Sequence, residues 1–176
     1  MNFTKKPSKL YHGSNVRILG HFKPVLQHGT LDHIHTRPAV FATARLDIAA
    51  LFMFPIEILH SIGFERDIAY ICIWGTSKDF KLKDIGGFIY TFSSESFEKV
   101  GKEYEWQSFK KVTPLEIKEY SQVIDGMIEC GVQVYFINNN GIFDRIVEQK
   151  NKRASILQEL ISENRKQGKN MKNFKT

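Results

Sequence analysis

The sequence predicts one α+β domain with a basic C-terminal extension, and three observations lead to that prediction. Short segments rich in β-forming residues outnumber the helical segments and do not alternate with them regularly, which disfavours a βαβ repeat. The segment DIAYICIW, at 67–74, has the length and composition of a buried strand. The sequence contains no GxGxxG or GxxxxGK[ST] element, which argues against a Rossmann or P-loop nucleotide site.

The composition is that of a globular protein, and its 176 residues are enough to bury a core. The net charge of +6 favours anionic partners without selecting one. Cys72 and Cys130 lie in apolar runs without disulfide or zinc-site spacing, so we expect reduced core residues. The first residues lack the apolar stretch of a signal peptide, and no segment reaches the ~20 apolar residues of a membrane span. We therefore expect a cytoplasmic protein with no membrane partner.

The elements of the N-terminal half follow from strand and turn signals. Residues 8–12 read as a short strand that ends in a glycine-containing turn. Residues 20–38 contain glycines, prolines and four histidines, which is typical of a long ordered loop. A strand over 39–43 is expected to lead into a helix over 46–54, which the proline at its end interrupts.

In the C-terminal half, the best local signal is for a helix over 115–129. Thr113 is a candidate N-cap, Pro114 suits the first helical position, and Glu116 completes a capping box. The strands expected after the first half are residues 67–74, 88–92, 104–109 and 132–137, with polar, turn-like residues at 93–102.

The chain is expected to end in a helix that runs from residue 144 to about residue 164. Its apolar stripe is partial, and the residues beyond it lack a core-forming pattern, so we expect a frayed tail. We accordingly divide the chain into a domain over 1–147 and a basic C-terminal helix with a flexible tail over 148–176.

Three motifs carry residues suited to chemistry: Tyr11-His12-Gly13-Ser14, Val40-Phe41-Ala42-Thr43 and Glu105-Trp106-Gln107-Ser108. In the first motif, His12 stands at a strand-to-turn edge, from which an imidazole can reach a ligand while Gly13 lets that ligand approach the backbone. A neutral histidine can donate a hydrogen bond to a ribose hydroxyl. The alternative interpretation is a surface histidine in a turn.

The order of the first two motifs resembles the ADP-ribosyltransferase superfamily, in the branch with a His-Tyr-Glu triad that includes diphtheria toxin and the poly(ADP-ribose) polymerases. The resemblance covers residues 8–112 and implies a split β-sheet core with few flanking helices and a C-terminal helix. It also implies that NAD is the substrate, that His12 anchors a ribose, and that Gly13 and Ser14 line the nicotinamide pocket.

In the second motif, the resemblance implies that Phe41, Ala42 and Thr43 lie on the strand that binds NAD. The sequence departs from the family here, because Val40 stands where the family has tyrosine, and the later stacking tyrosine falls near Leu51 or Phe52. Phe41 or Phe52 can supply the ring, since stacking requires a π-surface more than a hydroxyl. The alternative is that these are core residues and that Thr43 caps a helix.

In the third motif, Glu105 is the carboxylate that the reaction requires, since a fixed anion stabilises positive charge that develops on the ribose. Residues 93–104 fit the family's acceptor-binding loop. Glu103 shares a strand face with Glu105 and remains open as the key carboxylate; an exposed acidic pair is the alternative. We expect His12 and Glu105 to line a single crevice.

Two further patterns have plainer interpretations. His21, His28, His33 and His35 match no common zinc spacing, so we expect a polar loop and no metal. The basic residues of the tail lack interleaved aromatic residues, which gives base stacking little support.

The sequence therefore predicts an NAD-dependent ADP-ribosyltransferase, a glycosyltransferase that releases nicotinamide and transfers ADP-ribose to an acceptor, protein or nucleic acid. Hydrolysis of NAD is a variant of the same chemistry. An RNA 2′-phosphotransferase ranks below it, because the cleft arginines of that family are not matched. A non-catalytic module that binds NAD or nucleic acid on the same fold, and a basic domain that contacts DNA or RNA, remain as alternatives from another class.

Overall fold

The computed structural model describes residues 6–26, 37–55, 57–58, 60–65, 67–100, 104–149, 152, 155–159 and 162. In chain order the elements are β1 (Lys9–Ser14), β2 (Val40–Thr43), α1 (Leu46–Leu51), β3 (His60–Glu65), β4 (Ile68–Trp74), α2 (Ser77–Lys81), β5 (Gly87–Ser93), β6 (Glu98–Lys99), β7 (Glu105–Ser108), β8 (Glu116–Tyr120), α3 (Val123–Glu129), β9 (Gln133–Ile137) and α4 (Asn140–Glu148). The predicted α+β class is confirmed.

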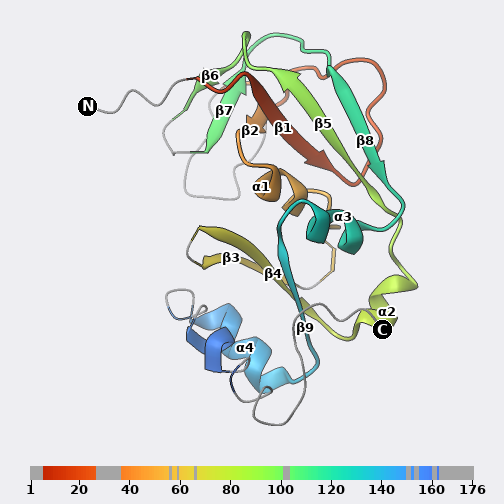
Figure 1. Ribbon diagram of the computed structural model, residues 1–176, viewed down its shortest axis with the longest axis vertical. Helices are drawn as coiled ribbons and strands as arrows, with labels where there is room; N and C mark the ends of the chain where they lie inside the picture. Colours follow the sequence, from red (N-terminus) through yellow and green to blue (C-terminus); the bar gives the residue numbers. More distant parts are fainter. Residues whose placement is uncertain are drawn as a thin grey trace.

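The described strands form two sheets, which lie at different levels of the molecule (Figure 1). The larger has the order β6-β7-β2-β1-β5-β8, and all its neighbouring strands are antiparallel. The smaller has the order β3-β4-β9, in which β4 and β9 run parallel. α1 and α3 lie between the two sheets, and α4 covers the far side of the smaller sheet (Figure 1).

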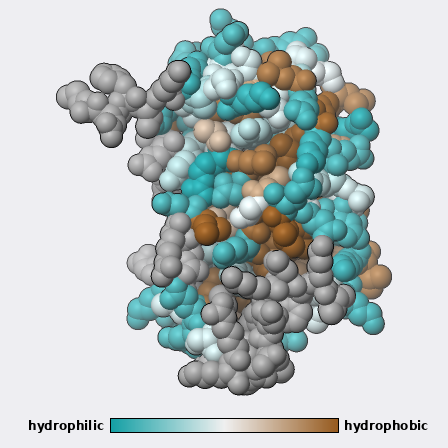
Figure 2. Space-filling view, in the orientation of Figure 1, coloured by the Kyte–Doolittle hydropathy of each residue, from teal (hydrophilic) through white to brown (hydrophobic). Residues whose placement is uncertain are grey.

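Three hydrophobic clusters hold these layers together. The central core joins α1 and α3 to the facing sides of both sheets, with Ala49, Met127 and Ile71 among its buried members. The outer core covers the opposite side of the larger sheet and includes Leu10, Tyr90, Phe92 and Trp106. On the face shown in Figure 2, brown hydrophobic residues show in the middle of the molecule, at the level of α1 and α3.

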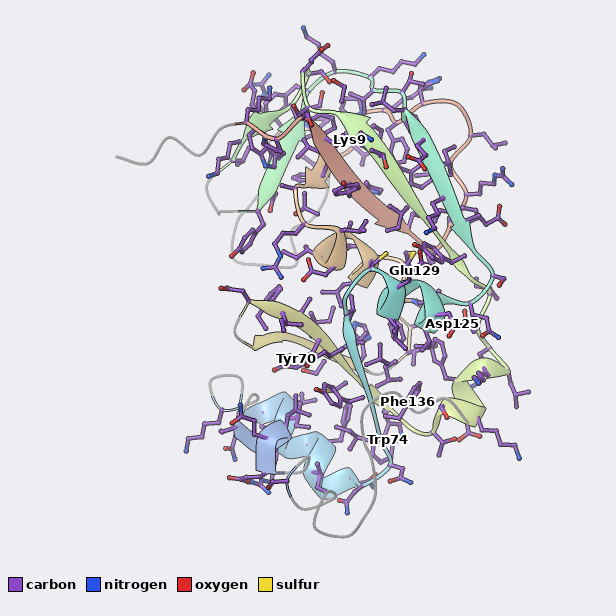
Figure 3. The ribbon with its side chains drawn as sticks, in the orientation of Figure 1. Lys9, Tyr70, Trp74, Asp125, Glu129 and Phe136 are labelled. Carbon is purple, nitrogen blue, oxygen red and sulfur yellow. The ribbon has the colours of Figure 1, made fainter. Side chains whose placement is uncertain are left out.

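The third cluster attaches α4 to the smaller sheet. Tyr70 and Trp74 extend from β4 (Figure 3), and the Trp74 ring meets that of Phe143 of α4 edge to face at 5.4 Å. Ile156 and Leu157 are buried in the same cluster, so residues on both sides of the expected boundary at 147/148 pack on one sheet. That boundary falls inside α4.

The predicted helix over 115–129 is wrong in its first half. Residues 116–120 form β8, which pairs with β5 from Thr91↔Glu116 to Gly87↔Tyr120, and only α3 is helical. The capping signal is local, and pairing with a distant strand overrides it. The sequence prediction also missed β3 and α2.

The other two predicted helices, over 46–54 and from residue 144 to about residue 164, begin or end at other residues than expected. α1 ends at Leu51, and the amides of Phe52, Met53 and Phe54 bond three residues back in a tighter final turn. α4 begins at Asn140 rather than residue 144, because the Asn139 side chain accepts from the Ile142 amide at 3.2 Å and caps the helix. α4 ends at Glu148, and a separate helical stretch follows at 155–159.

Among the described residues, no helix combines the length and the apolar character needed to cross a membrane.

Candidate functional site

The three motifs lie on three consecutive strands of the larger sheet, β1, β2 and β7. Tyr11 of β1 pairs with Thr43 of β2, and Thr43 pairs in turn with Glu105 of β7. Adjacent strands are about 4.8 Å apart, so the first and third motifs are separated by roughly 10 Å across the sheet. Segments that are distant in the sequence therefore meet in one place.

The sheet is split between β1 and β2. Both strands are fully described, and Tyr11↔Thr43 is the one residue pair that joins them, whereas β1 pairs with β5 at six positions and β2 with β7 at four. In a continuous antiparallel ladder, residues 12–14 would pair with residues 40–42. We call this interruption the split; the first motif borders one side of it and the second motif borders the other.

His12 connects the two sides of the split through its side chain. Its Nδ1 lies 2.8 Å from the Phe41 carbonyl oxygen, and its ring meets Phe22 edge to face at 5.0 Å. Because a carbonyl only accepts, Nδ1 carries the hydrogen. Burial lowers the pKa of His12, although the bond to Phe41 opposes this. The neutral ring therefore leaves Nε2 as an acceptor, so it can accept a hydrogen bond from a hydroxyl group but cannot donate one.

His12 and Glu105 point to opposite faces of the sheet, which contradicts the expected common crevice wall. Successive residues of a strand alternate between faces, and antiparallel partners share one. Tyr11 packs against the central core, so Thr43 and Glu105 lie on that side. His12 is paired with Tyr90 and lies on the side of the outer core. Tyr11, which sequence reasoning passed over, shares the face of Glu105.

Gly13 and Ser14 have structural roles of their own. A Cβ on Gly13 would lie 1.9 Å from the Ala49 carbonyl oxygen of α1, so the missing side chain makes room for a helix. The sequence prediction assigned this space to a ligand. The Ser14 hydroxyl accepts from the Val16 amide at 3.1 Å and stabilises the turn after β1.

The second motif is divided between the two faces of the sheet. Val40 and Ala42 are buried in the outer core, which accounts for small apolar residues at these positions. Phe41 is half-buried, while Phe52 is 62% exposed just beyond α1. The structure therefore places the two stacking candidates in unlike surroundings.

Thr43 and Gln107 make an unusual polar patch beside Glu105. Both are buried, at 7% and 5% exposure, and the Gln107 amide donates to Glu105 Oε1 at 3.3 Å. The Thr43 hydroxyl accepts from the Arg45 amide at 3.1 Å, so it shapes the turn into α1, although Arg45 is the N-cap residue. Buried polar side chains are more informative than exposed ones, because burying them costs free energy.

Arg45 and Asp47 form a clamp next to this patch, which the sequence prediction missed. The Arg45 guanidinium binds both carboxylate oxygens of Asp47 and the Asp67 carbonyl. It also lies over the Tyr104 ring, 4.9 Å from its centroid. The hydrogen bond to Asp47 raises the pKa of Arg45. Partial burial raises the pKa of Asp47, but the bond to and charge of Arg45 outweigh this and hold it below its usual value.

The clamp joins three parts of the chain. The Asp47 carboxylate also accepts from the Ala69 amide of β4 at 3.3 Å, so the start of α1 is tied to the smaller sheet. Tyr104 directly precedes Glu105, so the same arginine contacts the residue that leads into the third motif. The one sign of the clamp in the sequence is an arginine and an aspartate two residues apart where a helix is predicted to begin.

Other expected residues fall outside the described chain. Glu103 is one of them, and so are His28, His33 and His35. Of the described residues, no three or more His, Cys, Asp or Glu are grouped to hold a metal ion. Cys72 and Cys130 are buried and neither forms a disulfide, as predicted.

No family model matches the chain, and no significant match to a curated protein or a solved structure was found.

Proposed function

We propose that this protein is an NAD-dependent ADP-ribosyltransferase, which cleaves the nicotinamide–ribose bond and transfers ADP-ribose to a protein or nucleic-acid acceptor. One observation carries the proposal: the first two motifs border the two sides of the split, and the third lies on the next strand. The split agrees with the split sheet that the family resemblance implies. The two buried cysteines form no disulfide, which suits a reducing cytoplasmic setting.

The residues have distinct roles in this proposal. His12 Nε2 accepts a hydrogen bond from a ribose hydroxyl. Gly13 and Ser14 line the nicotinamide pocket through their backbone, because α1 occupies the side-chain space of Gly13 and the Ser14 hydroxyl is bonded in the turn. Phe41 or Phe52 stacks on the nicotinamide ring. Glu105 stabilises the positive charge that develops on the ribose as nicotinamide leaves. The Gln107 amide holds one oxygen of that carboxylate in place.

The opposite directions of His12 and Glu105 require the ligand to reach both faces of the sheet. At the split the ligand would have no backbone ladder to break, because residues 12–14 do not pair with residues 40–42, although it would have to displace the His12–Phe41 hydrogen bond. NAD is an extended molecule, longer than the roughly 10 Å between the two outer strands. A dinucleotide that crosses the sheet at the split would contact the histidine on one side and the carboxylate on the other.

The test is nicotinamide release from labelled NAD by the wild type and by Glu105→Gln. We expect the variant to lose at least about 100-fold in turnover while NAD binding persists, as for the removal of one charge-stabilising group. Glu116→Gln, an exposed glutamate of β8, is the matched control and should retain full activity.

Equal release by the wild type and Glu105→Gln would remove Glu105 from the mechanism. NAD binding without nicotinamide release by the wild type would instead identify a non-catalytic NAD-binding module. Loss of the 2′-phosphate from RNA only when NAD is present, with transfer of that phosphate to the ADP-ribose part of NAD and release of nicotinamide, would identify the phosphotransferase.

A further inference from the structure

Three segments converge at the end of β2 and β7 that lies away from Glu105. Phe22 and Val112 form an isolated antiparallel bridge, with backbone N–O distances of 2.8 and 3.1 Å. A second bridge joins Val25 to Ala39, the residue before β2. The segments 21–26, 37–40 and 108–112 therefore lie side by side.

This convergence gathers positive charge. In the register of the first bridge, Lys23 lies directly opposite Lys111, and both are exposed. Lys110 is exposed in the adjoining turn, where its amide donates to the Ser108 hydroxyl at 3.3 Å. Exposed Arg37 lies over the half-buried Phe109 ring, 4.4 Å from its centroid. We call Lys23, Arg37, Lys110 and Lys111 the basic surface.

In the described part of the chain, no carboxylate is paired with these charges. The three segments carry no aspartate or glutamate, and within the described chain none of the four cations forms an ion pair with a carboxylate. Like charges directly opposite each other on paired strands destabilise the pairing. Desolvation, together with the charges of nearby Lys111 and Lys23, lowers the pKa of His21. An anionic partner would relieve this repulsion.

The chemistry of the basic surface favours nucleic acid over an acidic peptide. One of its cations, the Arg37 guanidinium, lies over the Phe109 ring, and the exposed lysines follow that ring and face it from the neighbouring segment. Guanidinium groups match phosphate geometry, and cations interleaved with aromatic rings are typical of proteins that bind single strands. We propose that the basic surface binds the phosphate backbone of single-stranded nucleic acid. The inference goes beyond the enzymatic proposal and does not depend on it.

The test is the affinity of the full chain for fluorescent dT20 and rU20 at several salt concentrations. With about four phosphate contacts, wild-type affinity should fall roughly 50-fold between 50 and 200 mM salt. The double variant Lys23→Gln/Lys111→Gln should bind at least about tenfold more weakly, with a salt slope shallower by about 1.4. The double variant removes two positive charges that repel each other, so it should be at least as stable as the wild type. Thermal unfolding measures this stability.

Lys78→Gln/Lys83→Gln is the matched control, because it removes the same charge from exposed positions in and just after α2. It should bind like the wild type. Comparison of the two oligonucleotides shows whether DNA or RNA is preferred. An equal loss in both double variants, no wild-type binding, or tighter binding to polyglutamate than to either oligonucleotide would overturn the proposal.

Discussion

The two sides of β1 are held in different ways. Toward β5, the strand forms a ladder of six residue pairs; toward β2, it has one pair and the His12 side chain. At the first boundary, the backbone N–H and C=O groups of the two strands are bonded to each other along the ladder. The second boundary depends on individual side chains, which a ligand can contact. The comparison shows why we place the candidate site at the boundary between β1 and β2, where backbone pairing is reduced to one residue pair.

The largest expected effect comes from crowding the β1 side of the split. Gly13→Ala would place a methyl group against the Ala49 carbonyl oxygen, a backbone atom that cannot rotate away. We expect a loss of about 3 kcal/mol or more in the free energy of unfolding, measured by urea denaturation.

Gly141→Ala is the control for this change. Its added Cβ would meet Asn139 Oδ1 at an ordinary 3.6 Å, within the first turn of α4. We expect unchanged stability or a gain of up to about 1 kcal/mol. If Gly13→Ala were as stable as the wild type, α1 would not pack closely against β1 at the split.

A smaller effect is expected from breaking the clamp beside Glu105. Asp47→Asn removes the charged partner of Arg45, and we expect a loss of about 2 kcal/mol at pH 7, measured by chemical denaturation. The folded pKa of Asp47 is lowered, so its contribution is complete above the ordinary carboxyl pKa of about 4 and is lost as the pH falls through the folded value.

The variant should therefore differ most from the wild type at neutral pH and least in acid. Asp144→Asn, at an exposed position of α4, should leave stability unchanged at both pH values. A difference between wild type and Asp47→Asn that grows in acid would contradict the ion pair as its source.

The smallest effect concerns the side-chain link across the split. His12→Asn keeps an N–H near the Phe41 carbonyl but cannot titrate. Because burial lowers the folded pKa of His12, the unfolded chain takes up the proton first, and wild-type stability falls as the pH drops below about 6.5. Thermal unfolding should show a shallower decline from pH 7 to 5 in the variant; an identical decline would mean that His12 is not buried as a neutral ring.

The sequence predicted the strands of the candidate site well, because their signals are local. The composition of 39–43 and the pattern around Trp106 each identify a strand without knowledge of its partner. The prediction for the β8 segment was wrong for the opposite reason. Thr113 and Pro114 carry a local helix signal, but residues 116–120 pair with a strand that lies more than 20 residues away in the sequence.

The face on which each site residue lies could not be predicted. Alternation separates Tyr11 from His12, but which of them joins Glu105 depends on the register with β2. The meeting of Arg45 with Tyr104 likewise depends on how α1 leaves β2, which no pattern in the sequence specifies.

The most direct test of the central claim is to follow the backbone amide signals of the ¹⁵N-labelled protein by NMR during titration with NAD. We predict saturable shifts at residues 12–14, 41–43 and 105–107, on both sides of the split, with little change along the continuous boundary between β5 and β8. Shifts confined to the β5–β8 boundary or to the smaller sheet, or no shifts at millimolar NAD, would contradict the account.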